Sequence, residues 1–304
     1  MTRLLLIVLL CSPLPLGAGQ KPIEDGVAPT IRTDVNLVMV PVTVTDRRGA
    51  TVNGLDRTNF SVFEDRVPQS IVSFSAEDAP SSVGLIFDTS GSMRDRLDAA
   101  TASLRTFVED ANPEDEAFLL TVSSRPEVYS GFTGDVGALT GAAQFAEARG
   151  STALIDAVYA GLQRMRSASN ARRALLIVSD GMDNHSGHSK GELMRIALEA
   201  DVQIYTIAID SRVRVKKAIE LQTENRGLAL LEDLAERTGG IHFRIADRQE
   251  TGRVVAAALL ALRNQYLLAY RPAGADQPGK WHKIQVRLNV ANTNVSARNG
   301  YYSR

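Results

Sequence analysis

Three features of this 304-residue chain predict an α/β fold with a doubly wound, mainly parallel sheet and a small flanking all-β region. Between residues 83 and 262, short apolar runs alternate with segments whose apolar residues recur at helical spacing, which is typical of parallel strands joined by crossover helices. Before residue 78 and after residue 264, only strand-like patterns occur. Two of the central apolar runs end in a carboxylate, where the binding loops of open α/β sheets lie.

The central elements follow from the spacing of apolar residues. Continuous apolar runs are expected to form strands buried on both faces, and apolar residues three and four apart are expected to form helices. Gly239-Gly240 is a typical C-terminal stop for one helix. The predicted strands are 83–87, 117–122, 126–132 (short and antiparallel), 174–179, 202–209 and 241–245, and the predicted helices are 97–108, 138–148, 153–165, 192–200, 228–237 and 254–262.

Neither end of the chain has enough predicted strands for an independent core. We therefore predict that residues 35–78 and 264–304 pair into one small sandwich, with the α/β region inserted between them. The alternative is two separate β extensions that lie on the α/β region. The strands expected at the two ends are 37–45, a hairpin of 60–63 and 69–74 around Asp65, then 266–270, 281–288 and 294–302.

The charge balance excludes one class of partner. The chain has 34 basic and 35 acidic residues and a formal net charge of −1. Because no field of one sign dominates, a nucleic-acid partner is not expected. The only cysteine, Cys11, lies in a segment expected to be removed on export, so thiol catalysis and disulfides are not expected in the mature chain.

Residues 1–19 have the pattern of a secretory signal peptide. Arg3 precedes the apolar run 4–10, and small residues follow at 17–19. The run is far shorter than the ~20 residues that span a bilayer. We expect an exported protein, periplasmic or extracellular, with residues 20–34 as a linker and no membrane span.

A carboxylate and two hydroxyls alternate directly after the apolar run 83–87. Asp88, Ser90 and Ser92 would lie where a buried strand ends, at the edge where open α/β sheets bind ligands. Oxygen ligands of this kind suit hard cations such as Mg²⁺. Because Asp, Ser and Gly are also ordinary turn residues, a plain strand-to-helix turn is the alternative for this segment taken alone.

Two later segments supply further oxygen ligands. Thr152 opens a helical pattern, where a helix cap is the simpler interpretation. Asp180 follows the apolar run 174–179 and precedes Gly181, where a turn is the simpler interpretation. The combined set carries two formal negative charges and leaves one coordination position of the ion open. Its members are Asp88, Ser90, Ser92, Thr152 and Asp180.

These three segments resemble the metal-ion-dependent adhesion site (MIDAS) of von Willebrand factor A (VWA) domains. The family pattern is Asp-x-Ser-x-Ser, a distant Thr and a later Asp-Gly, and all five positions match in order. The resemblance implies a Rossmann-like VWA domain at residues 82–248, completed by a C-terminal helix at 249–263. It implies a β region on either side, at residues 35–78 and 264–304.

The same resemblance implies roles for the five ligands. Ser90 and Ser92 would bind the metal directly, and Thr152 would join or leave the shell with ligand state. Asp88 and Asp180 would act largely through water. The sixth position would take an Asp or Glu carboxylate from a partner protein, with Mg²⁺ as the metal and Mn²⁺ or Ca²⁺ as alternatives.

The flanks are similar to a subgroup, the VWFA-related proteins abundant in Acidobacteria. Arg66 departs from the subgroup pattern, which has Gly in a Glu-Asp-Gly turn. Because a non-Gly residue in a left-handed turn is unfavourable, another turn type is expected here. The matching segments are 34–42, 62–69, 264–270 and 298–302.

The resemblance implies a protein-binding module and no enzyme. One alternative is a structural scaffold whose site needs no metal. Another is a metal-dependent hydrolase, for which Asp180 is the only clear general base. No Gly-rich phosphate loop or nucleophile elbow occurs. His185 and His188 are expected in a polar loop, with a transition-metal pair as the alternative, and His282 is expected on a strand surface.

Overall fold

The structure is a computed structural model that describes residues 37–76, 79–109, 111–139, 141, 148–209, 218–272 and 278–303. The predicted signal peptide and linker, and most of the helix predicted over 138–148, lie outside the described residues. No helix among the described residues is long and apolar enough to cross a membrane. The described part belongs to one compact unit.

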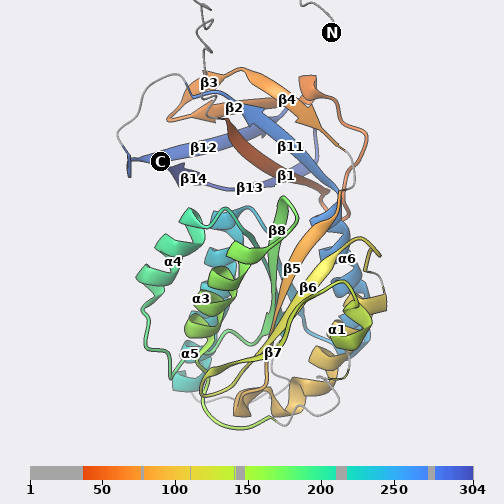
Figure 1. Ribbon diagram of the computed structural model, residues 1–304, viewed down its shortest axis with the longest axis vertical. Helices are drawn as coiled ribbons and strands as arrows, with labels where there is room; N and C mark the ends of the chain where they lie inside the picture. The colour runs from red at the N-terminus through yellow and green to blue at the C-terminus, as the bar shows by residue number, and fades with distance from the viewer. Residues whose placement is uncertain are drawn as a thin grey trace, which may run out of the picture. The chain divides into compact units, whose positions relative to one another are not determined.

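A six-stranded sheet forms the centre of the α/β region, in the order β10-β9-β8-β5-β6-β7 (Figure 1). Five strands are parallel, and β7 runs antiparallel to β6, as predicted. This sheet confirms the α/β class. The strands are β5 (Ser81–Asp88), β6 (Glu116–Val122), β7 (Pro126–Thr133), β8 (Arg172–Ser179), β9 (Gln203–Ile209) and β10 (His242–Ile245).

Helices cover both faces of this sheet (Figure 1). Side chains of α1 and α6 pack on one face, and those of α3, α4 and α5 pack on the other. The α-helices are α1 (Leu97–Glu109), α3 (Leu154–Arg164), α4 (Lys190–Glu199), α5 (Ala218–Thr238) and α6 (Thr251–Arg263). Short 3₁₀ segments lie at Arg57–Asn59, Gly91–Arg96, Val136–Leu139, Met165–Ser167 and Arg248–Glu250.

Strand β5 shows why the central strands are continuous apolar runs. All its residues are buried, and successive side chains point to opposite faces. Leu85 and Phe87 belong to the core under α1 and α6, whereas Ile86 belongs to the core under α3, α4 and α5. Gly84 has no room for a side chain, because a Cβ there would lie 2.3 Å from the Phe118 ring.

Strands from both ends of the described chain pair with each other in two four-stranded sheets, β13-β1-β11-β4 and β14-β12-β2-β3. Their inward side chains share one core, which includes Val40, Val62, Leu268 and Ile284. The strands are β1 (Val38–Asp46), β2 (Phe60–Glu64), β3 (Val67–Gln69), β4 (Ile71–Ser75), β11 (Gln265–Tyr270), β12 (Trp281–Leu288), β13 (Thr293–Ala297) and β14 (Gly300–Tyr302).

Three predicted elements need correction. The hairpin partner of β2 is β3, whereas β4 pairs with β11 in the other sheet, because alternation defines a strand and not its neighbour. The helix predicted at 228–237 begins at Ala218, since its first turns lack a clear apolar stripe. The strand predicted at 294–302 is divided into β13 and β14.

The β2–β3 turn corrects two further expectations. Asp65 and Arg66 have φ values of 47° and 72°, so the turn is left-handed at both positions despite the arginine. The Asp65 carboxylate anchors it by accepting from the Lys283 N–H at 2.9 Å and lying 3.0 Å from His282 Nδ1. His282 is only 2% exposed, so its predicted position on the strand surface was wrong.

Candidate metal site

The two candidate carboxylates lie at the carboxyl edge of the central sheet. Asp88 is the last residue of β5, and Asp180 directly follows the last residue of β8. These strands are parallel neighbours in register, so their ends meet at the same edge. Both residues are almost completely buried, at 0% and 1% exposed.

Backbone hydrogen bonds join the three motif segments. The Gly91 N–H donates to the Gly150 carbonyl at 3.0 Å, and the Arg149 N–H donates to the Thr89 carbonyl at 3.0 Å. The Thr152 carbonyl in turn accepts from the N–H groups of Asn184 and His185, each at 3.0 Å. The loops that carry the five candidate ligands are therefore held together at this edge.

The side chains around Asp88 form a short chain of oxygen atoms. Asp88 Oδ1 accepts from the Ser90 N–H at 2.9 Å, and Asp88 Oδ2 accepts from Ser179 Oγ at 2.5 Å. Ser90 Oγ lies 3.0 Å from Ser92 Oγ. Ser90 is buried and Ser92 is exposed, so this group of oxygens reaches from the core to the surface.

Burial and a like charge disturb Asp88. Burial, together with the negative charge of Asp180, raises the pKa of Asp88 to about 6, although Ser179 and Ser90 donate hydrogen bonds to it. Two buried carboxylates that repel each other are unfavourable unless a cation compensates them. The edge therefore carries a negative charge that its neutral hydrogen-bond donors do not offset.

Arg96 supplies part of that compensation, which the sequence analysis missed. Its guanidinium donates to Asp180 Oδ2 and lies 3.6 Å from the Glu224 carboxylate on α5. The other Asp180 oxygen accepts from the Met182 N–H at 3.0 Å. Arg96 lies in the 3₁₀ segment just after the Asp-x-Ser-x-Ser sequence, and only that proximity could have indicated its role.

The loop after Gly181 positions Thr152. Asn184 Oδ1 accepts from the Thr152 N–H at 2.9 Å, and Asp183 Oδ1 accepts from the Ile155 N–H at 3.1 Å. The start of α3 and Thr152 are therefore held by polar groups of the loop, and the residue before the helix provides no side-chain cap. Asn184 and Asp183 are positioning residues that no sequence pattern indicated.

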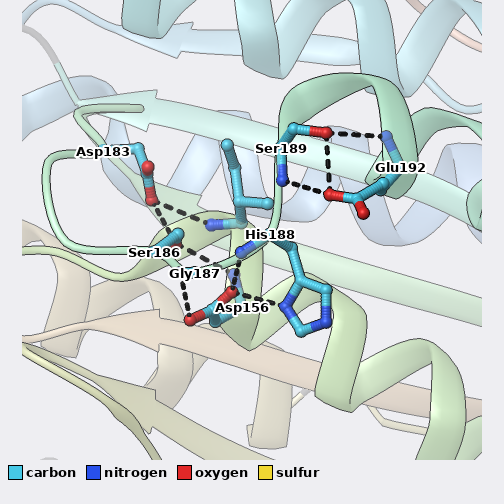
Figure 2. A network of polar contacts seen from close by, with 8 residues as sticks. Asp156, Asp183, Ser186, Gly187, His188, Ser189 and Glu192 are labelled. Atoms are coloured by element: carbon cyan, nitrogen blue, oxygen red, sulfur yellow. Dashed lines mark hydrogen bonds and ion pairs between the residues drawn. The ribbon is translucent and has the colours of Figure 1, made fainter.

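Figure 2 shows how the same loop is fastened to α3. Asp156 accepts from the N–H groups of Gly187 and His188 at 2.9 and 3.0 Å, and His188 Nδ1 lies 2.7 Å from it. Burial alone would raise the pKa of Asp156, but these contacts hold it below its usual range. The His188 ring also stacks on Tyr159 at 4.1 Å. His188 thus fixes the loop through its Nδ1 atom.

Two glycines let α5 approach the Asp180 loop closely. Gly181 has a φ of +79°, and a Cβ at this position would lie 2.3 Å from the Gly227 carbonyl oxygen. A Cβ on Gly227 would meet the Gly181 backbone at 2.7 Å. Backbone therefore packs on backbone where Asp180 is held, and neither glycine tolerates a side chain.

The donor set fits a hard divalent cation. Carboxylate and hydroxyl oxygens are the ligands that Mg²⁺ prefers, and the two buried carboxylates carry charge that calls for a cation. Among the described residues, no group of three or more His, Cys, Asp or Glu side chains could hold a metal. A site at this edge would therefore depend on Ser90, Ser92 and Thr152 as well.

Comparison with known proteins agrees on the class of domain. An α/β sheet with these loops at its carboxyl edge is the architecture of a VWA domain. Residues 83–182 match the family model described as von Willebrand factor type A domain, which supports a VWA-domain protein. No curated protein matches the chain.

Solved structures with a similar fold were also found. The von Willebrand factor type A protein of Catenulispora acidiphila is 12% identical, with a TM-score of 0.47, 90% of this chain covered and 75% of that one. The vWF domain of a type V pili tip protein from Porphyromonas gingivalis is 13% identical, with a TM-score of 0.47 and coverage of 66% and 99%. An aerotolerance-related membrane protein of Bacteroides fragilis is 15% identical, with a TM-score of 0.45 and coverage of 60% and 98%.

Proposed function

We propose that this chain is an exported, metal-dependent protein-interaction module that captures an Asp or Glu carboxylate of a partner protein. The observation that carries the proposal is the pair of buried carboxylates, Asp88 and Asp180, at a sheet edge lined by neutral hydroxyls. Export follows from the signal-peptide pattern of residues 1–19.

Asp88, Ser90, Ser92, Thr152 and Asp180 would hold the ion. Mg²⁺ is the metal we favour, with Mn²⁺ and Ca²⁺ as alternatives, because small sites rich in hydroxyls suit Mg²⁺. A bound divalent cation supplies a positive charge that a partner carboxylate can neutralise. Three of the five ligands are neutral, so the chain leaves part of that charge uncompensated and the partner completes the site.

Arg96 tunes this charge. Its guanidinium pairs with Asp180, so the ligand set has less effective negative charge than two free carboxylates would have. Weaker compensation lowers the affinity for the cation and makes its binding more dependent on the partner carboxylate.

A metal-free scaffold is the second candidate, and Arg96 is the observation that favours it. A guanidinium that already pairs with Asp180 could replace the cation as the structural counter-charge. A hydrolase is less well supported, because both oxygens of Asp180 accept hydrogen bonds and a general base needs a free oxygen.

Calorimetric titration of the mature protein with Mg²⁺ separates these candidates. The module predicts saturable binding that Asp88→Ala abolishes and that Glu199→Ala leaves intact, because Glu199 is an exposed acid at the end of α4. Equal binding by both variants, or a Mg²⁺ affinity unchanged in Asp88→Ala, contradicts the proposed site.

A second titration tests carboxylate capture, with acetate as the probe. The module predicts that acetate raises the Mg²⁺ affinity of the parent protein and that Thr152→Val weakens this effect more than it weakens Mg²⁺ binding itself. If Thr152→Val reduces both equally, the proposed role of Thr152 in capturing the carboxylate is wrong.

A further inference from the structure

A cavity lies at the opposite edge of the central sheet from the candidate metal site. It has a volume of about 160 Å³ and is lined by the first residues of β8 and β9, the ends of α4 and α5, and strands β1 and β11. A single water needs roughly 10–15 Å³ of such space, so the cavity has room for a small molecule.

The lining of this cavity is strongly basic, although the chain as a whole carries a net charge of −1. Arg172, Arg173, Arg237 and Arg298 line it, and Asp201 is the only acid among the described residues of its wall. Four arginines against one aspartate leave a formal charge of +3. A concave site with one sign of charge raises the local concentration of the opposite ion.

The arginines differ in how far the protein satisfies them. Arg298 pairs with Asp201, with Nη1 and Oδ1 2.5 Å apart, but its buried Nε has no hydrogen-bond acceptor among the described residues. No carboxylate in the described part of the chain pairs with Arg173 or Arg237. Buried N–H donors without acceptors are rare and unfavourable, so an acceptor in the cavity would be stabilised.

The opposite wall of the cavity is apolar. Met39 on β1, Leu267 on β11 and Leu198 in α4 are partly buried there. Apolar side chains would exclude water from one side of an occupant while the guanidiniums bind the other. A purely inorganic anion uses only the basic half of such a cavity.

We propose that this cavity binds a small organic acid, with a carboxylate held by the arginines and a short aliphatic chain on the apolar wall. Guanidinium groups bind carboxylates through paired, charge-assisted hydrogen bonds. The proposal does not depend on the metal site, which lies at the other edge of the sheet.

The test uses calorimetric titration of the mature protein in excess chelator, so that no metal can recruit the probe. Acetate, butyrate and hexanoate are the probes, and inorganic phosphate tests an anion without the aliphatic chain. The proposal predicts saturable binding in the millimolar range or tighter, with affinity that rises roughly threefold to fourfold per added methylene. Phosphate binding without hexanoate binding overturns the assignment to an organic acid.

Arg173→Gln and Arg237→Gln test the basic half, with Arg253→Gln as the matched control. Arg253 is an exposed arginine on α6 that does not line the cavity. Each lining variant should weaken hexanoate binding roughly tenfold or more, because it removes a charge-assisted hydrogen bond. The control should bind as the parent protein does.

A structural role for these arginines has a different signature. Cations near the ends of α4 and α5 could serve only to stabilise the helix termini. The lining variants would then lower the melting temperature but leave hexanoate affinity unchanged. That result, or equal weakening by Arg253→Gln, or no saturable binding of any probe, overturns the proposal.

Discussion

Two buried carboxylates in this molecule, Glu64 and Asp88, have opposite surroundings. Glu64 lies in the β region and is 7% exposed, and Asp88 lies at the carboxyl edge of the central sheet and is fully buried. Both accept hydrogen bonds from hydroxyl groups. They differ in the sign of the nearest charge, and that difference separates a structural acid from a candidate functional one.

The surroundings of Glu64 are complementary to its charge. Tyr270 and Tyr301 donate to Glu64 Oε2, and His282 Nδ1 lies 3.7 Å from Oε1. Burial, together with the adjacent Glu64 carboxylate, raises the pKa of Tyr270 far above its ordinary value, so the phenol stays a donor. The cluster joins four strands, β2, β11, β12 and β14, and leaves the acid satisfied.

The surroundings of Asp88 are not complementary in the same way. Its nearest charged neighbour is Asp180, which raises the Asp88 pKa beyond the effect of burial alone. Among the described residues only Arg96 offsets this pair, and Arg96 is shared with Glu224. The comparison shows that hydrogen bonds alone do not identify a functional acid, whereas an uncompensated like charge does.

The largest effect is expected where the helix backbone approaches the Asp180 loop. Gly227→Ala should lower the free energy of unfolding by about 3 kcal/mol, because its Cβ would overlap the Gly181 backbone. It should also weaken Mg²⁺ binding, since the Asp180 loop must shift. Chemical denaturation and calorimetry measure the two effects.

Gly252→Ala is the matched control. Gly252 lies in α6, and a Cβ added there would have no neighbouring atom within 4 Å, so alanine should stabilise the protein by roughly 0.5–1 kcal/mol. If both substitutions change stability by the same amount and sign, the close contact at Gly227 has no role in holding the edge.

Arg96→Gln should produce a smaller change with opposite signs in two measurements. Without the guanidinium, Asp180 regains its full negative charge, so Mg²⁺ affinity should rise roughly tenfold. In chelator the same variant should be less stable than the parent protein. Arg94→Gln, which changes an exposed arginine in the same 3₁₀ segment, is the control and should change neither. A fall in Mg²⁺ affinity on Arg96→Gln would show that Arg96 supports the site and does not compete with the cation.

The smallest effect is expected at the β2–β3 turn. Arg66→Gly should stabilise the protein by about 1 kcal/mol, because it removes a side chain from a left-handed position and makes an Asp-Gly turn. Thermal unfolding measures the change. A loss of stability would mean that the Arg66 side chain makes a contact worth more than the backbone strain.

The predictable part of this structure is the part that apolar burial dictates. The strands that end at Asp88 and Asp180 were predicted because strands buried on both faces are continuous apolar runs. Their parallel pairing then brought the two acids to the same edge. The partner of β4 and the start of α5 were missed, because neither has a local pattern that identifies it.

The polar groups that position the candidate site were beyond prediction for a related reason. Arg96, Asn184 and Ser179 act through single contacts made across loops, and such contacts follow no period in the sequence. Ser179 precedes Asp180 directly, so only its proximity to a candidate ligand could have indicated it. The buried His282 was missed because its partner, Asp65, is distant in sequence.

The central claim is that Asp88 carries an uncompensated charge that a divalent cation offsets. The most direct test exchanges a carboxylate for an amide at both buried acids, Asp88→Asn and Glu64→Gln, and measures the free energy of unfolding in chelator and in Mg²⁺. Because the folded-state pKa of Asp88 lies above the unfolded value, its ionisation destabilises the metal-free protein as pH rises.

At pH 7 in chelator, we expect Asp88→Asn to be more stable than the parent protein by up to about 3 kcal/mol, a difference that fades as pH falls towards 4. Mg²⁺ should stabilise the parent protein and Glu64→Gln but not Asp88→Asn, and Glu64→Gln should be less stable than the parent under every condition. If Asp88→Asn is destabilised in chelator, or if Mg²⁺ stabilises it as much as it does the parent protein, the account is wrong.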